Sequence, residues 1–441
     1  MNSLEHRITP SFLLRFTLPT VVMMVFNSIY TMVDGAFVSN FVGTGALSAV
    51  NIVYPLINLI FAIGIMLATG GSAVVAKQMG EGKAERARQS FTLITLAGTA
   101  AGLLLAIAGL AFTRDIVLAL GANEAIYGYC YDYALYLSPF IPLGILQVLF
   151  QYLLVTAGKP NLGLIATIAG GVANIALDYV LIVPLGMGIK GAALATGIGF
   201  AIPSVACLLY FWLARGGSLF FTRPVFSFHT LLKACTNGSS EMVSNLSVAI
   251  TTFLFNIMMM RYLGEDGVAA ITIVLYAQFL FTAVFLGYTS GVAPLISYNY
   301  GAHNTDRLKR LYRLSMTFIV LCSVGAYALS LLLSRGVVSV FAKSGTRVFN
   351  LAIHGMSLFA VGFLFMGFNI FASGLFTAFS NGKVSAILSF LRTFVFILLT
   401  ILALPPLIGV DGVWLSIPVA ELLSLGVAGW YLIRLRKTYG Y

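Results

Sequence analysis

Two aspartates stand out because they lie in long apolar stretches of the chain. Asp34 follows FNSIYTMV in the first apolar run, and Asp178 lies in GGVANIALDYVLIV, four residues after Asn174. Residues four apart share one helix face, so Asn174 and Asp178 are expected to point the same way. Thr196, in the next apolar run, adds a hydroxyl. Hard oxygen ligands of this kind can hold Na⁺, and a desolvated carboxyl beside a like charge can instead carry a proton.

Further polar side chains recur at helical spacing. Asn27 and Tyr30 precede Asp34 by seven and four residues, and Gln147 and Gln151 are four residues apart. Each group therefore forms a polar stripe on an otherwise apolar helix. A competing interpretation is that the acids only form hydrogen bonds between helices or reach towards the water interface.

Three more charged residues fall in apolar runs. Glu241 lies close to the start of the seventh run, so a role in helix packing competes with a role in binding a cation. Glu421 and Arg392 are interpreted as helix-packing or interfacial pairings.

The composition places all of these groups in a membrane protein. Hydrophobic residues make up 59% and charged residues 9% of 441 residues, and the mean hydropathy is +0.97. Soluble domains are about one quarter charged. Apolar runs of about 20 residues, each long enough to span a bilayer, occur twelve times. The sequence predicts an all-α polytopic protein of twelve transmembrane helices.

Basic residues indicate the orientation. If the amino terminus is cytoplasmic, 18 of the 25 Lys and Arg residues lie in cytoplasmic segments and six on the other side. This bias predicts that both termini are cytoplasmic. It also explains the basic excess without a nucleic-acid partner.

An internal repeat sets the domain organisation. Residues 41–88 align without gaps to residues 262–309, an offset of 221, and the PLGMGIKG segment near 184–191 meets residues 405–412 at the same offset. The prediction is an N-lobe at 1–213, a cytoplasmic linker at 214–235 and a C-lobe at 236–441. Six spans per lobe make this a parallel repeat, which is typical of secondary transporters. One chain already contains both lobes, so a monomer is the expected functional unit.

The polar constellation is not duplicated in the second lobe. At the offset of 221, Asp34 corresponds to Phe255, and Asp178 corresponds to Leu399. Requirements of the scaffold would tend to repeat, so an unrepeated polar cluster indicates a functional site. Pro19, early in the first run, weakens the helix ladder and favours a kink.

Enzymatic and ATP-driven functions find no support. No GxxxxGK[ST], GxSxG or HExxH motif occurs, and the four histidines are isolated. We therefore expect neither an enzyme nor an organic cofactor, and no metal beyond Na⁺ at the aspartates.

Four segments give the chain a family resemblance: VDGAFVSNFVGTGALSAV, GGSAVVAKQMGEGKAERAR, GSSEMVSNLS and PLISYNYGAHN. Together they resemble the multidrug and toxic compound extrusion (MATE) transporters, in particular their MepA-like bacterial subgroup. The resemblance implies a bacterial inner-membrane antiporter that exports amphipathic, often cationic, organic compounds against H⁺ or Na⁺, as in antibiotic resistance.

The resemblance also implies residue roles. The cation-coupling site corresponds to Asp34, Asn174, Asp178 and Thr196. The substrate cavity corresponds to Asn27, Tyr30, Gln147 and Gln151, with Glu241 as a further partner for cationic compounds. Pro19 corresponds to the bending point of the first helix.

One family feature is missing. Some relatives carry an acid in the tenth span that helps to hold Na⁺ in the C-lobe, and here that span has Asn369 and no acid. A flippase for lipid-linked oligosaccharides is the alternative function, but it would require a cleft rich in Arg and Lys for pyrophosphate. A receptor or scaffold would not explain acids at membrane depth.

Overall fold

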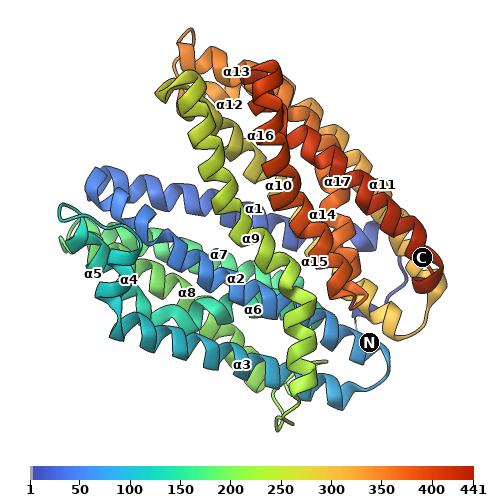
Figure 1. The fold of residues 1–441 in the computed structure, drawn as a ribbon. Helices are drawn as coiled ribbons and strands as arrows, with labels where there is room; N and C mark the ends of the chain where they lie inside the picture. The colour runs from blue at the N-terminus through green and yellow to red at the C-terminus, as the bar shows by residue number, and fades with distance from the viewer. Residues whose placement is uncertain (1–2) are drawn as a thin grey trace.

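The computed structural model describes residues 3–441, and all regular structure in this range is helical (Figure 1). Twelve helical segments are long and apolar enough to cross a membrane. The predicted all-α protein with twelve spans is therefore confirmed.

The helices of the first half are α1 (Pro10–Phe41), α2 (Thr44–Gly80), α3 (Ala84–Ala111), α4 (Thr113–Ala119), α5 (Tyr127–Leu137), α6 (Ile141–Thr156), α7 (Pro160–Ile182) and α8 (Gly188–Leu213). Those of the second half are α9 (Phe228–Leu263), α10 (Glu265–Gly301), α11 (Thr305–Leu332), α12 (Ser334–Phe341), α13 (Arg347–Phe359), α14 (Phe363–Ala378), α15 (Gly382–Phe390), α16 (Phe396–Ile408) and α17 (Val410–Tyr439). A π-helical turn, Leu391–Val395, joins α15 to α16. The fourth and tenth spans are each interrupted by a 3₁₀ turn, at Ser138–Phe140 and Ala360–Gly362.

The repeat appears in the helix boundaries. Helices α10 and α11 begin and end 221 residues after α2 and α3. From α6 and α14 onwards the helix starts differ by 222, because the start of α14 lies one residue further from the start of α12 than the start of α6 lies from that of α4. The additional residue falls in α12, which has eight residues where α4 has seven. At the offset of the helix starts, Asp178 corresponds to Thr400 instead of Leu399. Since Thr400 is not an acid either, the polar constellation remains unrepeated.

The predicted linker, 214–235, extends too far at its carboxyl-terminal end. Helix α9 begins at Phe228, where the side chain of Ser227 accepts a hydrogen bond from the backbone N–H of Thr230 at 3.3 Å. This cap starts the helix inside the segment predicted as linker. The connection between the lobes is therefore 214–227.

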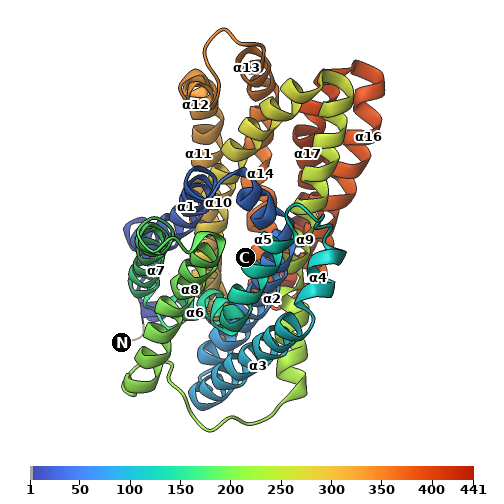
Figure 2. The same ribbon diagram turned by 90° about the vertical axis from the view of Figure 1, so that its left-hand side faces the viewer.

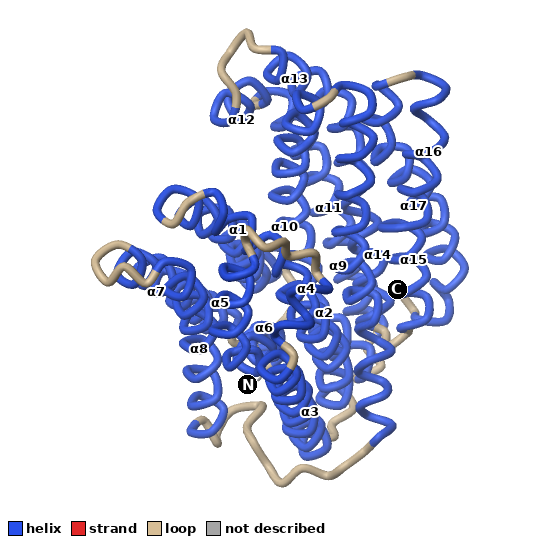
Figure 3. The backbone as a smooth tube through the Cα atoms, turned by 60° about the vertical axis from the view of Figure 1, so that its left-hand side comes forward, coloured by secondary structure: helices blue, strands red, loops and turns tan. Residues whose placement is uncertain are grey.

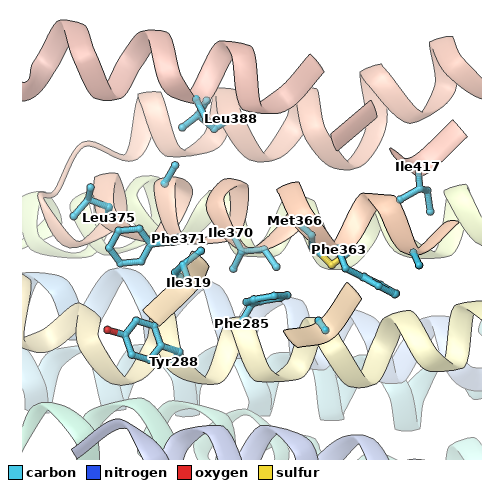
Figure 4. Packing of buried hydrophobic residues seen from close by; sticks show 14 of the residues in the cluster. Phe285, Tyr288, Ile319, Phe363, Met366, Ile370, Phe371, Leu375, Leu388 and Ile417 are labelled. Carbon is cyan, nitrogen blue, oxygen red and sulfur yellow. The ribbon is translucent and has the colours of Figure 1, made fainter. Parts of the chain in front are cut away.

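Each lobe has buried apolar cores. In the C-lobe, α10 and α14 pack through aromatic and aliphatic side chains that include Phe285, Tyr288, Phe363 and Phe371 (Figure 4). Separate clusters fill the N-lobe, one of which includes Phe91, Phe150 and Phe211.

The first turns of α1 and α9 are exchanged between these cores. Leu13 and Phe16, at the start of α1, belong to the C-lobe core. Ala234, near the start of α9, belongs to an N-lobe core. Each lobe therefore completes its core with the first helix of the other.

Close backbone contacts join the lobes at one end. A Cβ on Gly80 would overlap the carbonyl oxygen of Tyr298, and a Cβ on Gly301 would overlap that of Lys77. Both residues of one contact lie 221 positions from their counterparts in the other. Gly70 lies equally close to Ala234, and Gly238 to Met66. We call these four glycine contacts the lobe junction.

The lobe junction lies on the side where both termini are found. From there the lobes diverge, so that α12 and α13 lie far from the end of α1 and from α7 (Figures 2 and 3). The chain therefore forms two bundles that are joined at one end and separated at the other.

Candidate functional site

The two aspartates of the first lobe face each other. Asp34 on α1 and Asp178 on α7 lie within hydrogen-bonding reach through their carboxyl groups. Asp178 is fully buried, and as a carboxylate neither residue can donate a hydrogen bond. Both carboxyl oxygens of Asp178 and Oδ1 of Asp34 consequently lack a hydrogen-bond partner. Two adjacent buried carboxylates repel each other, so the pair requires a shared proton or another cation.

Three more residues surround this pair. Asn174, one turn before Asp178 on α7, is fully buried, and neither its Oδ1 nor its Nδ2 has a partner. Thr196 on α8 donates to the carbonyl of Ala192 at 3.0 Å and is hydrogen-bonded by Tyr133 on α5. Four helices thus contribute to one buried polar cluster.

Glycines explain how these helices come so close. A Cβ on Gly199 of α8 would lie 2.9 Å from the Cβ of Asn174, and one on Gly171 of α7 would lie 2.6 Å from the ring of Phe26 on α1. Contacts this short exclude any side chain at these positions without a shift of the helices. The missing side chains bring α1 and α8 against the face of α7 that carries Asn174 and Asp178.

The donor set fits a small hard cation. It consists of carboxylate, amide and hydroxyl oxygens, and no Lys or Arg of the described chain forms an ion pair with either aspartate. Oxygen ligands of this type suit Na⁺, and the adjoining carboxyls suit a proton equally. Asp34, Asp178, Asn174 and Thr196 would hold such an ion.

The predicted cavity residues are not all in one place. Tyr30 on α1 interacts electrostatically with both aspartates, so it belongs to the cluster. Gln151 is buried and donates from Nε2 to Thr167 at 3.0 Å, which ties α6 to α7. Gln147 is partly buried with an unpaired Oε1, and Asn27 is partly exposed on α1. Their roles in substrate binding remain predictions.

Glu241 lies apart from these residues, on α9 in the second lobe. It interacts electrostatically with Tyr152 of α6 and with Arg392. Tyr152 also reaches Ser290 of α10, with 3.5 Å between the hydroxyl oxygens. Glu241 therefore lies where the lobes meet, one turn after the junction glycine Gly238.

Sequence reasoning missed two features. Tyr133 lies in the tyrosine-rich segment YGYCYDYALYL, whose spacing does not single out the one that faces the aspartates. The expected pairings of Glu421 and Arg392 prove to be with each other, at 2.9 Å between Nε and Oε1. The sequence did offer a signal for this pairing: an acid and a base lie in apolar runs of the second half, and neither has a charged counterpart in the first half.

Replacing Asp178 by Asn should weaken cation binding at this pair without weakening the fold. The amide keeps the size of the side chain and can donate to Asp34, while it removes one of two uncompensated buried charges. We expect the affinity for the bound cation to fall at least about tenfold and the melting temperature to stay equal or rise. Thermal unfolding and calorimetric titration with Na⁺ and H⁺, measured on one preparation, check both parts; a lower melting temperature with intact cation binding would contradict the assignment.

Comparison with known proteins places the chain in a family. The MatE family model matches residues 19–180 and 242–402, one copy in each lobe. The chain belongs to the MatE family. Both matched segments start within the first helix of a lobe, which is the division that the internal repeat predicts.

Relatives and solved structures agree with this membership. The multidrug export protein MepA of Staphylococcus haemolyticus is 22% identical over 432 residues, covering 96% of this chain and 93% of the relative. A crystal structure of MATE in complex with MaL6 superposes with a TM-score of 0.92 at 23% identity, covering 98% and 97% of the two chains. An outward-facing multidrug resistance MATE transporter superposes with a TM-score of 0.91 at 24% identity, with coverage of 98% and 97%. The MatE chain is thus a polytopic membrane transporter and not an enzyme.

Proposed function

We propose that this MatE transporter is an antiporter that exports amphipathic, often cationic, organic compounds in exchange for H⁺ or Na⁺. The buried Asp34–Asp178 pair carries the proposal, because its unpaired oxygens call for a positive charge. Relatives that are named multidrug export proteins support the substrate class.

The proposed cycle uses the divergence of the lobes. With both termini cytoplasmic, the lobe junction closes the cytoplasmic side and the described state opens outwards. In this state the aspartates accept the coupling cation and lose their attraction for an organic cation, which leaves. After the lobes rock, the aspartates release the coupling cation to the cytoplasm and again favour the organic cation.

Helix α1 connects the ion site to the lobe movement. Thr17 and Val21, on either side of Pro19, pack on Gly291 and Gly287 of α10. The helix packs on the C-lobe as far as Val21, two residues after Pro19, and the segment beyond leads to Asp34 in the N-lobe. A proline at this boundary lets the two parts of the helix change their angle.

Replacing Pro19 by Ala should therefore slow transport while preserving binding. Alanine restores the backbone hydrogen bond and stiffens the helix, so rocking becomes harder. We expect efflux to fall at least about threefold with substrate affinity within about twofold. Equilibrium binding of a fluorescent cation measures substrate affinity, and vesicle efflux measures transport. If affinity and efflux fell by the same factor, a hinge role for Pro19 would be excluded.

Reconstituted vesicles test the function itself. An ethidium-type dye is loaded, and H⁺ and Na⁺ gradients are imposed separately across the membrane. Efflux driven by one of these gradients supports the antiporter and names its ion. Efflux that needs neither gradient would overturn it. The proposed setting is the inner membrane of a bacterium, with one chain as the functional unit.

A further inference from the structure

The second lobe contains its own buried charge cluster. Nε of Arg392 lies 2.9 and 3.0 Å from the two carboxyl oxygens of Glu421. Nδ2 of Asn369 donates to the same carboxylate at 2.6 Å and to the carbonyl of Glu421 at 2.8 Å. The side chains of Arg392 and Glu421 are only 15% and 5% exposed. Desolvation makes such a pair costly, so a role beyond stability is expected.

The local backbone is also unusual at this point. Arg392 lies in the π-helical turn Leu391–Val395, which packs against α9, the helix that carries Glu241. Single π-helical turns often occur at functional sites because they rotate side chains out of the regular helical register. Offsets of 221 and 222 both place glycine or phenylalanine at the positions of the first lobe that correspond to Arg392 and Glu421. The cluster is therefore not a requirement of the repeated scaffold.

Two carboxylates, those of Glu421 and Glu241, interact electrostatically with the guanidinium of Arg392. Arg392 acts electrostatically on Glu241 across the contact between the π-helical turn and α9. Among the described acids, however, only Glu421 lies within ion-pair distance of Arg392. The amide of Asn369 gives Glu421 an additional donor and fixes its position. Among the described residues, Arg392 is therefore paired with Glu421, and Glu241 beside the lobe junction has no ion-pair partner.

We propose that Glu421 is a positioning residue that holds Arg392 away from Glu241, so that Glu241 stays available to the cationic group of a substrate. The inference rests on the proposed function, and it adds a determinant of charge specificity in the second lobe. Without Glu421, Arg392 would pair with Glu241 and act as a built-in competitor of a cationic substrate. Uncharged substrates would not feel this competition.

Three variants separate positioning from packing. Glu421→Gln frees Arg392 and should weaken binding of a lipophilic monocation about tenfold. Glu421→Gln combined with Arg392→Gln removes the competitor as well, and binding should return to within about threefold of the unaltered protein. Asn369→Leu keeps both charges and removes only the supporting amide, so it should weaken binding in the same direction and by less.

The measurement is equilibrium binding of tetraphenylphosphonium to the purified full-length protein, with an uncharged amphiphile of similar size as a second ligand. Rescue in the double variant, with binding of the uncharged ligand unchanged throughout, supports the inference. Unchanged cation binding in both Glu421→Gln and Asn369→Leu overturns the inference. A double variant that binds the monocation as weakly as Glu421→Gln does also overturns it. A purely structural role predicts that last result, because the double variant loses more native contacts.

Glu241→Gln separates this inference from the proposed function. If this variant binds the monocation as the unaltered protein does, Glu241 is not the cation partner and the inference fails, while antiport through Asp34 stands. If the unaltered protein neither binds nor exports organic cations, the proposed function fails together with the inference.

Discussion

Vesicles containing the Asp34→Asn variant should show no more gradient-driven dye efflux than protein-free vesicles. Asp34 is the member of the acid pair that lies on α1, the helix that crosses from one lobe core to the other. An amide cannot exchange a proton, and it offers Na⁺ a weaker ligand than a carboxylate does. The site would therefore no longer change its charge between the two states, and coupling needs that difference.

The matched control is Asp115→Asn, the same chemical change at an exposed position on the short helix α4. Its efflux should equal that of the unaltered protein, which excludes a general effect of lost charge. Binding of the organic cation is measured for Asp34→Asn as well: a variant that still binds it has lost coupling, whereas one that does not has lost its fold. Full efflux by Asp34→Asn would show that coupling does not depend on this carboxyl.

A single methyl group at the lobe junction should have the second large effect. In Gly301→Ala the added Cβ would overlap the backbone carbonyl of Lys77, and neither backbone can give way without moving a helix. Alanine favours helices over glycine by about 1 kcal/mol, so propensity alone predicts stabilisation. We expect the opposite effect. The state that is closed at the lobe junction should become less populated, and efflux should fall at least about tenfold.

Gly325→Ala is the control, because this glycine also lies within a helix and a Cβ there meets no atom within 4 Å. This variant should transport normally and be equally or more stable. Thiol labelling of single cysteines placed near Lys77 and Tyr298 then reports whether the junction has opened. Equal efflux and equal labelling in the two alanine variants would show that transport does not require this close contact.

The sequence supports these predictions unevenly. Twelve spans and the repeat follow from local properties, namely apolar length and an offset that holds over α2 and α10. The pairing of Asp34 with Asp178 was also accessible, since two buried charges on different helices need each other or a cation. The offset of 221 does not extend to the helix starts near Asp178, because one additional residue lies between the starts of α12 and α14. The segments aligned at α2 and α10 precede this residue, so they cannot reveal it.

Side-chain partners were less accessible. Gln147 and Gln151 are four residues apart on one helix and have the same side chain, so the sequence does not distinguish them. In the structure Gln151 donates a hydrogen bond to Thr167, whereas Oε1 of Gln147 is unpaired. Tyr133 belongs to a helix that ends in a 3₁₀ turn, and such a turn changes which face of a span points inwards. The linker ended too late in the prediction because a serine cap, rather than hydrophobicity, starts α9.

The exchange of the first turns of α1 and α9 has a consequence for biosynthesis. Helix α1 leaves the ribosome before α10, but Leu13 and Phe16 belong to a core to which α10 contributes, and α10 begins more than 250 residues after the start of α1. The N-lobe likewise receives Ala234 only when the second half has begun to enter the membrane. The two halves therefore cannot mature one after the other as finished domains, and the native packing of the first helix is completed only when α10, the eighth span, has been inserted.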